Sequence, residues 1–293
     1  MDTRELLRKV RRIEIVTRRL VHEQMSGSYH SVFKGRGMSF DQVRLYQPGD
    51  EIRLIDWNVS ARTGDVYIKE FVEERELTVL VAVDISSSME TGSGSLSHRE
   101  VAAELAATVA LSAIHNGDRV GLLLFSDEIV KFVPPKKTRG HGLRVIREVL
   151  AAESSEESGT DLKGALAHIG LLLKRRSVIF LVSDFLDVSG VEREVRALTQ
   201  RHDLIPLHIR DPLHLDPPPL GTIHAHDPES ASMQDIPLGF PGFRRAYREA
   251  VHAQISEVET LFRRARTDVI PILLGESPIG PMLSYFKLRA RRH

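Results

Sequence analysis

The clearest pattern along the chain is a series of short apolar runs separated by longer amphipathic stretches. The runs cover residues 79–83, 120–125, 178–182, 204–209 and 269–274. Apolar runs of this length without polar alternation are typical of strands buried on both faces of a parallel sheet. Residues 129–133 are also strand-like and follow the second run closely, which predicts a hairpin between them.

The stretches between these runs have the spacing of helices. We expect helices over about residues 98–115, 141–152, 161–174, 190–201 and 243–265, with a terminal helix after the last strand. The turn sequence Asn116-Gly117-Asp118 ends the first of them, and Thr160 or Asp161 supplies an N-cap for the third. Strands that alternate with helices predict an α/β fold with a doubly wound, mostly parallel sheet.

The sequence predicts that the chain has three parts. Residues 1–26 form an N-terminal amphipathic helix, with apolar positions at helical spacing: Leu6, Val10, Ile13, Val16 and Leu20. Residues 27–76 are rich in glycine and polar side chains and are interpreted as a small β-rich subdomain. Residues 77–293 form the α/β domain, which carries a Pro/His-rich insertion at about 211–237.

Composition narrows the classes of function. The 293 residues contain 40 Lys and Arg against 40 Asp and Glu, so global charge favours neither nucleic acid nor an acidic membrane surface. The absence of cysteine excludes disulfides, thiolate metal sites and cysteine nucleophiles. We expect a cytoplasmic protein, because the sequence has neither a long apolar stretch for a transmembrane segment nor a signal-peptide core.

Polar residues with oxygen side chains follow the predicted strands. Asp84, Ser86 and Ser88 come directly after the first strand, Thr160 lies at a helix start, and Asp184 follows the third strand. The carboxyl ends of parallel strands and the following helix N-termini share one edge of a sheet, so these side chains are expected to converge. Hydroxyl and carboxylate oxygens are the ligands that Mg²⁺ prefers.

This set resembles the metal-ion-dependent adhesion site of von Willebrand factor A domains. There an Asp-x-Ser-x-Ser sequence, a distant Thr and a distant Asp hold a divalent ion, which is Mg²⁺ or Mn²⁺. The resemblance implies that Asp84, Ser86, Ser88, Thr160 and Asp184 are the metal residues here. It also implies a non-catalytic module for protein–protein interaction, whose partner offers a Glu or Asp to the ion.

A second resemblance covers nearly the whole chain and concerns the bacterial family called domain of unknown function 58. Its signature is carried by the segments Gly35 to Phe40, Arg44 to Asp50, Arg53 to Trp57, Ser60 to Arg62, Arg210 to Pro212 and Arg244 to Tyr247. The resemblance implies a von Willebrand A-like domain and a MoxR-type AAA+ ATPase as partner. The pair would act in chaperone-like assembly or activation of protein complexes.

The upstream signature also has a physical interpretation. Pro48-Gly49-Asp50 is a turn sequence, and we expect Trp57 to anchor the subdomain to the core. The basic and acidic side chains of this segment suggest internal ion pairs: Arg44, Arg53 and Arg62 with Asp50 and Asp56. A partner-recognition surface is the alternative for these charges.

Two other functions stay open at this point. One is a metal-dependent phosphohydrolase on a similar sheet, although Ser86 stands where a second carboxylate is usual. The other is a structural domain with an empty metal site. His22 to Ser26 begins like a zincin helix but lacks the second histidine, and His224-Ala225-His226-Asp227 is a weak transition-metal candidate. His202, His208 and His214 are expected on the surface, and Glu153, Glu156 and Glu157 in a solvated loop.

Overall fold

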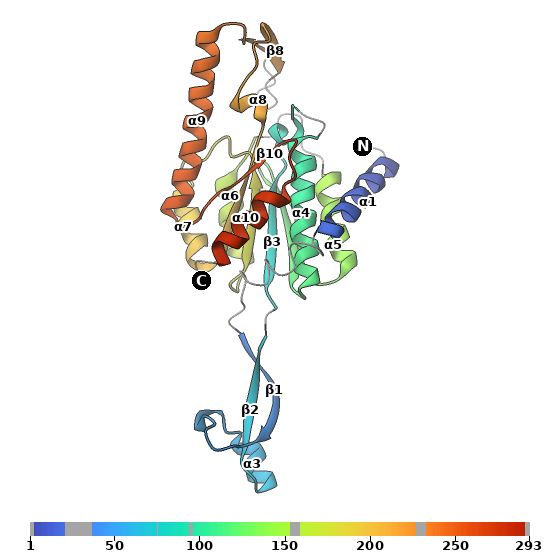
Figure 1. The fold of residues 1–293 in the computed structure, drawn as a ribbon, viewed down its shortest axis with the longest axis vertical. Helices are drawn as coiled ribbons and strands as arrows, with labels where there is room; N and C mark the ends of the chain where they lie inside the picture. Colours follow the sequence, from blue (N-terminus) through green and yellow to red (C-terminus); the bar gives the residue numbers. More distant parts are fainter. Residues whose placement is uncertain are drawn as a thin grey trace. The chain divides into compact units, whose positions relative to one another are not determined.

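The computed structural model describes residues 3–20, 37–74, 76–93, 96–152, 159–226 and 233–290. The chain divides into two compact units (Figure 1). One is Phe33–Leu77, and the other combines Met1–Val32 with Thr78–His293.

The larger unit is built on a six-stranded sheet in the order β10-β7-β6-β3-β4-β5. Its strands are β3 (Thr78–Asp84), β4 (Arg119–Phe125), β5 (Ile129–Lys136), β6 (Val178–Ser183), β7 (Asp203–Arg210) and β10 (Ile270–Leu273). Every neighbouring pair is parallel except β4 and β5, which form the predicted hairpin. The predicted fold class and these strands are confirmed.

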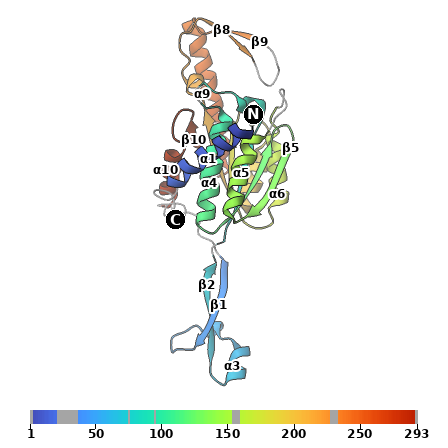
Figure 2. The ribbon, with the colours of Figure 1, turned by 90° about the vertical axis from the view of Figure 1, so that its right-hand side faces the viewer.

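Helices cover both faces of this sheet, as Figures 1 and 2 show. They are α4 (His98–His115), α5 (Arg139–Ala151), α6 (Leu162–Leu172), α7 (Glu192–Arg201), α9 (Pro241–Arg264) and α10 (Ile279–Ala290). Phe286 of α10 packs edge-on against Phe180 of β6, with ring centroids 6.4 Å apart. The predicted caps are also present: Asn116 ends α4, and the Asp161 side chain accepts a hydrogen bond from the Gly164 amide to begin α6.

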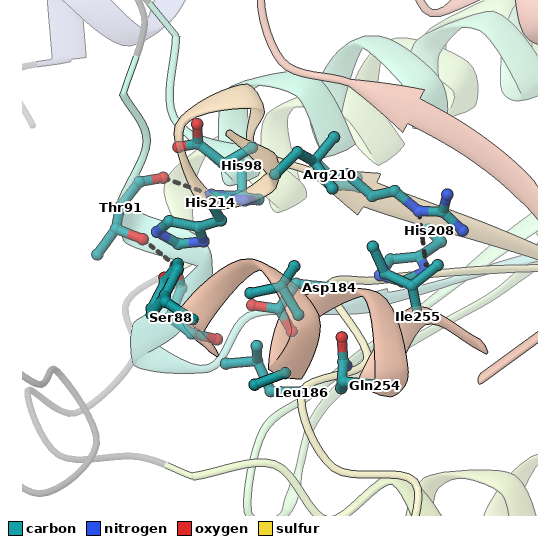
Figure 3. Close-up of a pocket in the computed structure, with 16 residues that line it drawn as sticks. Ser88, Thr91, His98, Asp184, Leu186, His208, Arg210, His214, Gln254 and Ile255 are labelled. Atoms are coloured by element: carbon teal, nitrogen blue, oxygen red, sulfur yellow. Dashed lines mark hydrogen bonds between the residues drawn. The ribbon is translucent and has the colours of Figure 1, made fainter. Parts of the chain in front are cut away.

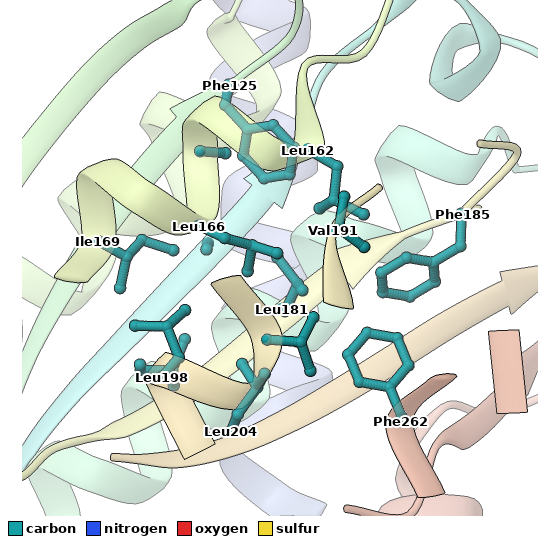
Figure 4. Close-up of a cluster of buried hydrophobic side chains, with 14 of the residues drawn as sticks. Phe125, Leu162, Leu166, Ile169, Leu181, Phe185, Val191, Leu198, Leu204 and Phe262 are labelled. Atoms are coloured by element: carbon teal, nitrogen blue, oxygen red, sulfur yellow. The ribbon is translucent and has the colours of Figure 1, made fainter. Parts of the chain in front are cut away.

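The face covered by α6, α7 and α9 holds a large apolar cluster (Figure 4). Leu80, Leu123 and Leu181 project into it from the strands, while Leu166 and Phe262 enter from helices. All five side chains are fully buried. Burial of side chains of this size contributes about 1.5–3 kcal/mol each, so this cluster stabilises the packing of the three helices on the sheet.

The N-terminal helix α1 (Thr3–Leu20) packs on α4 and α5 (Figure 2). Ile13 is buried as the helical spacing predicts, but Val16 is 52% exposed and Thr17 takes the buried position instead. Two ion pairs fix the helix from its polar side, between Lys9 and Glu100 (2.5 Å) and between Glu14 and Arg139 (2.6 Å). The prediction for Val16 is therefore wrong, because the buried face continues from Ile13 to Thr17, four residues on, and leaves Val16 beside it.

The insertion after β7 forms a short helix and a hairpin. Helix α8 (Pro212–Leu215) is capped by Asp211, and β8 (Thr222–His226) pairs antiparallel with β9 (Met233–Pro237). Among the described residues, no helix combines the length and the apolar character needed to cross a membrane.

The smaller unit is an antiparallel pair, β1 (Gly37–Leu45) with β2 (Tyr67–Glu74), joined through η2 (Ile52–Leu54) and α3 (Trp57–Thr63). Gly49 adopts a φ of 112° in the predicted turn, which explains the glycine there. Arg44 forms the expected ion pair with Asp50 (2.8 Å) and another with Glu70 (2.6 Å). The hydrogen bond from Arg44 lowers the pKa of the Asp50 carboxyl to about 2.

Other expectations for this segment are corrected. Trp57 is 67% exposed at the start of α3, so the prediction that it anchors the subdomain to the core is wrong. Asp56 pairs with Lys69 at 3.7 Å and caps α3, in place of an ion pair with a nearby arginine. Gly35 and Arg36 of the signature lie outside the described residues, as do His22 to Ser26.

The contribution of the apolar cluster can be measured with two leucines of α6. Leu166→Ala should lower the free energy of unfolding by about 2–5 kcal/mol, because it opens a cavity in the buried cluster. Leu171→Ala is the matched control, since Leu171 is 68% exposed and its truncation should cost less than about 0.5 kcal/mol. Urea unfolding of both variants would contradict the assignment if the two losses were equal.

Candidate metal site

The candidate site lies where the order of strands in the sheet reverses. When only the six strands of the main sheet are numbered along the chain, β3 is strand 1 and β6 is strand 4. The strands then lie in the order 3-2-1-4-5-6 across the sheet. The connections leave β3 and β6 toward opposite sides, so their carboxyl ends flank a crevice in which ligands of such sheets bind. Asp84 is the last residue of β3, and Asp184 follows the last residue of β6.

Asp84 is fully buried at this point and is held by neutral donors. Its Oδ1 accepts the Ser86 amide at 2.9 Å, and its Oδ2 accepts the Ser183 hydroxyl at 2.7 Å. The Thr160 hydroxyl donates to the same Oδ2 at 3.4 Å. The structure therefore brings Asp84, Ser86 and Thr160 together as the sequence predicts, although 76 residues separate Asp84 from Thr160.

The two serines of the Asp-x-Ser-x-Ser sequence lie beside each other. Ser88 lies in the short 3₁₀ helix η3 (Ser87–Glu90), and Ser86 directly precedes it. This turn of helix brings the Ser86 and Ser88 hydroxyl oxygens to 3.1 Å from each other. Both residues are buried, so their oxygens face the site instead of bulk solvent.

Asp184 adds a second carboxylate to this group. It is 8% exposed, and its charge acts directly on Asp84. Burial, followed by the negative charge of Asp184, raises the pKa of the Asp84 carboxyl to about 7. Two carboxylates this close oppose each other's ionisation, and a cation between them would relieve that cost.

The donor set fits Mg²⁺ or Mn²⁺. All five predicted residues present oxygen ligands, three of them neutral hydroxyls and two of them carboxylates. This is the hard-donor chemistry that both ions take, and the strained carboxylate pair supplies the negative charge. Among the described residues, no group of three or more His, Asp or Glu offers an alternative cluster for a metal.

Two residues that support the site were missed from the sequence. The Ser183 hydroxyl donates to Asp84 and accepts the Phe185 amide, which orients the carboxylate. Arg99 of α4 is 6% exposed; its Nη2 donates to the Ile85 carbonyl at 3.1 Å and pairs with Glu90 at 2.5 Å. The position of Ser183 at the strand end, directly before Asp184, is the sequence feature that could have indicated its role. Nothing in the helical pattern indicates the role of Arg99.

The signature residue Asp211 fixes the loop that follows η3. Its carboxylate accepts the Ser93 amide and the Leu213 amide, each at 2.8 Å, and also the Ser93 hydroxyl. His98 at the start of α4 bonds the Thr91 carbonyl at 2.7 Å through Nδ1. These contacts hold the segment after Ser88 against the end of β7, so the Arg210-Asp211-Pro212 motif positions the candidate site.

The expectation of surface histidines is wrong for two of them. His202 is 3% exposed and His208 is 2% exposed, whereas His214 is an exposed residue of α8. Burial, with the nearby charge of Arg210, lowers the pKa of the His208 imidazole to about 3, so it is neutral. In the insertion, His224 Nδ1 lies 2.5 Å from Asp235. Asp227 and Glu153, Glu156 and Glu157 lie outside the described residues.

A cavity of about 540 Å³ opens beside the candidate metal site (Figure 3). Ser88 and Asp184 form part of its wall, together with Leu186, His214 and Gln254. Gln254 of α9 donates to the Phe185 carbonyl, which joins α9 to the end of β6. The site therefore lies next to a pocket that residues of α8 and α9 line.

The pKa of Asp84 predicts how stability changes with pH in metal-free protein. The folded value of about 7 lies above the unfolded value of about 3.9, so this group makes the fold less stable as pH rises between them. Asp84→Asn should therefore raise the free energy of unfolding by about 1–4 kcal/mol near pH 8 and by little near pH 4. The measurement is urea unfolding in EDTA, with exposed Glu276→Gln as the control. If Asp84→Asn is no more stable than wild type near pH 8, the claim that the ionised Asp84 destabilises the fold is wrong.

Several known proteins are similar to this chain. Uncharacterized proteins of Mycobacterium tuberculosis and Mycobacterium bovis are each 25% identical over 293 residues, which is 99% of this chain and 92% of theirs. Among solved structures, the conserved hypothetical protein BatB from Bacteroides thetaiotaomicron aligns with a TM-score of 0.48 at 14% identity, over 74% of this chain and 100% of that chain.

A von Willebrand factor type A protein from Catenulispora acidiphila aligns with a TM-score of 0.38 at 12% identity, over 77% of this chain and 44% of that chain. Likenesses at this level carry no weight for function, and the fold assignment depends on the strand order itself. The family model described as "Protein of unknown function DUF58" matches residues 42–257. The chain therefore belongs to the DUF58 family.

Proposed function

We propose that this protein is a non-catalytic, divalent-metal-dependent protein-binding module. The observation that carries the proposal is the buried carboxylate of Asp84, which is surrounded by hydroxyl oxygens and opposed by Asp184. A buried pair of like charges costs stability, and it persists in a fold when the site gains something from it. Binding a divalent cation is the gain that this donor set favours.

Each residue has a distinct part in the proposed site. Ser86, Ser88 and Thr160 would hold Mg²⁺ or Mn²⁺ through their hydroxyls, and Asp84 and Asp184 would act directly or through water. When bound, the ion would offer a free position to a Glu or Asp of a partner protein. With Asp84 and Asp184 acting through water, the direct ligands from this chain would be three neutral hydroxyls, so the inner coordination shell would favour an acidic partner group.

The arrangement gives less support to hydrolysis. A phosphohydrolase of this kind needs an acid–base group next to its aspartate nucleophile. The residue at that place is Ser86, whose hydroxyl lies against Ser88 at 3.1 Å. Asp84 itself is buried and hydrogen-bonded to Ser183, so its oxygens are held in place instead of being free to attack.

We further propose a MoxR-type AAA+ ATPase, or a client of that ATPase, as the partner. What supports this is the match of residues 42–257 to the DUF58 family, together with the resemblance described from the sequence, which implies such an ATPase as partner. The module would then act as an adaptor in chaperone-like assembly or activation of protein complexes.

Metal binding is tested by calorimetry on matched variants. Wild type should show a saturable heat change on titration with Mg²⁺ and with Mn²⁺, and Ser86→Ala should weaken binding by about tenfold or more because a ligand is lost. Ser87→Ala is the control, since it changes the neighbouring residue of the same turn outside the proposed ligand set. Equal titrations of wild type and Ser86→Ala would overturn the metal site.

Partner binding and catalysis are separated in a second assay. The MoxR-type ATPase of the same organism should be captured by wild type in Mg²⁺, and capture should be lost in EDTA or with Asp84→Ala. Neither wild type nor the Asp84→Ala variant should hydrolyse p-nitrophenyl phosphate. Turnover that Asp84→Ala abolishes would show a phosphohydrolase instead of a binding module.

A further inference from the structure

A second cavity adjoins the cavity beside the candidate metal site. The first has a volume of about 540 Å³ and the second about 300 Å³. They share the lining residues Thr91, Asp211, His214 and Tyr247, and we call the two adjoining cavities together the groove. Both volumes fall within the range in which proteins bind ligands, about 300–1,000 Å³.

The groove runs from the candidate metal site to the insertion. At one end Ser88 and Asp184 belong both to the site and to the wall of the first cavity, as Figure 3 shows. At the other end the β8–β9 hairpin contributes Ile223 and Ile236. A ligand bound at the metal site would therefore extend over the groove toward the hairpin.

The charged side chains in the middle of the groove are already paired. Arg210 donates to Glu259 at 2.9 Å, and the Asp211 carboxylate accepts the Ser93 and Leu213 amides. These contacts use the charges within the fold, so they do not select an ionic ligand. What the groove offers beyond the metal site is mainly apolar surface, from Leu215, Ala250 and Val251 among others.

Exposed leucines line the same groove. Leu186 is 55% exposed and lines the first cavity, while Leu213 (42%) and Leu220 (61%) line the second. Large apolar side chains gathered around a concave surface and left in water are typical of interaction sites. The groove is therefore charged at its metal-site end, and the rest of its lining is mainly apolar.

We infer that this groove binds a peptide segment of a partner protein in which an acidic residue is followed by large apolar residues. The acidic residue would occupy the metal end, and the apolar side chains would fill the two cavities in sequence. This inference deepens the proposed function and rests on it for the acidic residue alone. The apolar preference follows from the groove itself and is tested separately.

The test uses two pools of short fluorescein-labelled peptides with capped ends. Both contain one Glu followed by three variable positions, drawn from Leu, Ile, Val and Phe in one pool and from Ser, Thr, Asn and Gln in the other. In Mg²⁺, fluorescence polarisation should show the apolar pool binding at least about tenfold more tightly, since filling an apolar pocket is worth about this much per side chain.

Two tryptophan substitutions on α9 locate the binding. Ala250 is an exposed residue that lines the first cavity, so Ala250→Trp should fill it and weaken binding of the apolar pool about tenfold. Ala253→Trp is the matched control, because Ala253 is exposed on the same helix and lines neither cavity. Urea unfolding confirms that both variants fold.

The outcomes separate the groove from the metal. Loss of peptide binding with Ala250→Trp but not with Ala253→Trp supports the groove as the binding surface. Weaker binding to wild type in EDTA, or with Gln in place of the peptide Glu, supports the acidic residue at the metal end. If peptide binding depends on the groove but is unchanged by EDTA and by replacement of the peptide Glu with Gln, the proposed function is wrong and the apolar preference of the groove is still supported. Equal affinity for the two pools, or no effect of Ala250→Trp, overturns the inference. A dimer of wild type that Ala250→Trp disrupts would show that a second copy fills the groove, which also overturns it.

Discussion

The structure of the larger unit depends on one constraint, which is a buried carboxylate at the end of the central strand. Asp84 ends β3, which has parallel partners on both sides and is buried along almost its whole length. The strand can bring a charge to this depth only because Ser86, Ser183 and Thr160 surround it with donors. The charge of Asp184 opposes the ionisation of Asp84, and this is why we propose a cation at this point.

The surrounding contacts hold the turn after β3 and its flanking loops in place. Arg99 reaches from α4 to the Ile85 carbonyl and to Glu90, so the helix that follows the loop also fixes the turn containing the serines. Asp211 ties Ser93 to the end of β7 from the other side. The same loops line the groove, so the candidate metal site and the peptide-binding surface inferred beside it are built from one set of contacts.

Much of this could be predicted from the sequence, because the informative patterns are local. Apolar runs such as 79–83 predict buried strands, and the caps at Asn116 and Asp161 end and begin helices through their own neighbours. The five candidate ligands follow from strand order, since carboxyl ends of parallel strands share one edge. Arg99 could not be found in this way, because its role depends on where α4 lies against β3. The surface expectation for His208 fails for the same reason, because its burial is set by Phe185 and by the strands on both sides of β7. Trp57 shows the reverse error, since apolar character alone does not bury a side chain, and no residue of its short helix α3 is buried.

The most direct test of the central claim is the anomalous scattering of crystals grown with Mn²⁺. The account predicts an anomalous peak within coordination distance of the Ser86 and Ser88 hydroxyls, next to Asp84 and Asp184, and predicts no peak there for Asp84→Ala. A peak at another position, or none under conditions where calorimetry shows no binding either, would contradict the claim that this buried carboxylate pair exists to hold a divalent ion.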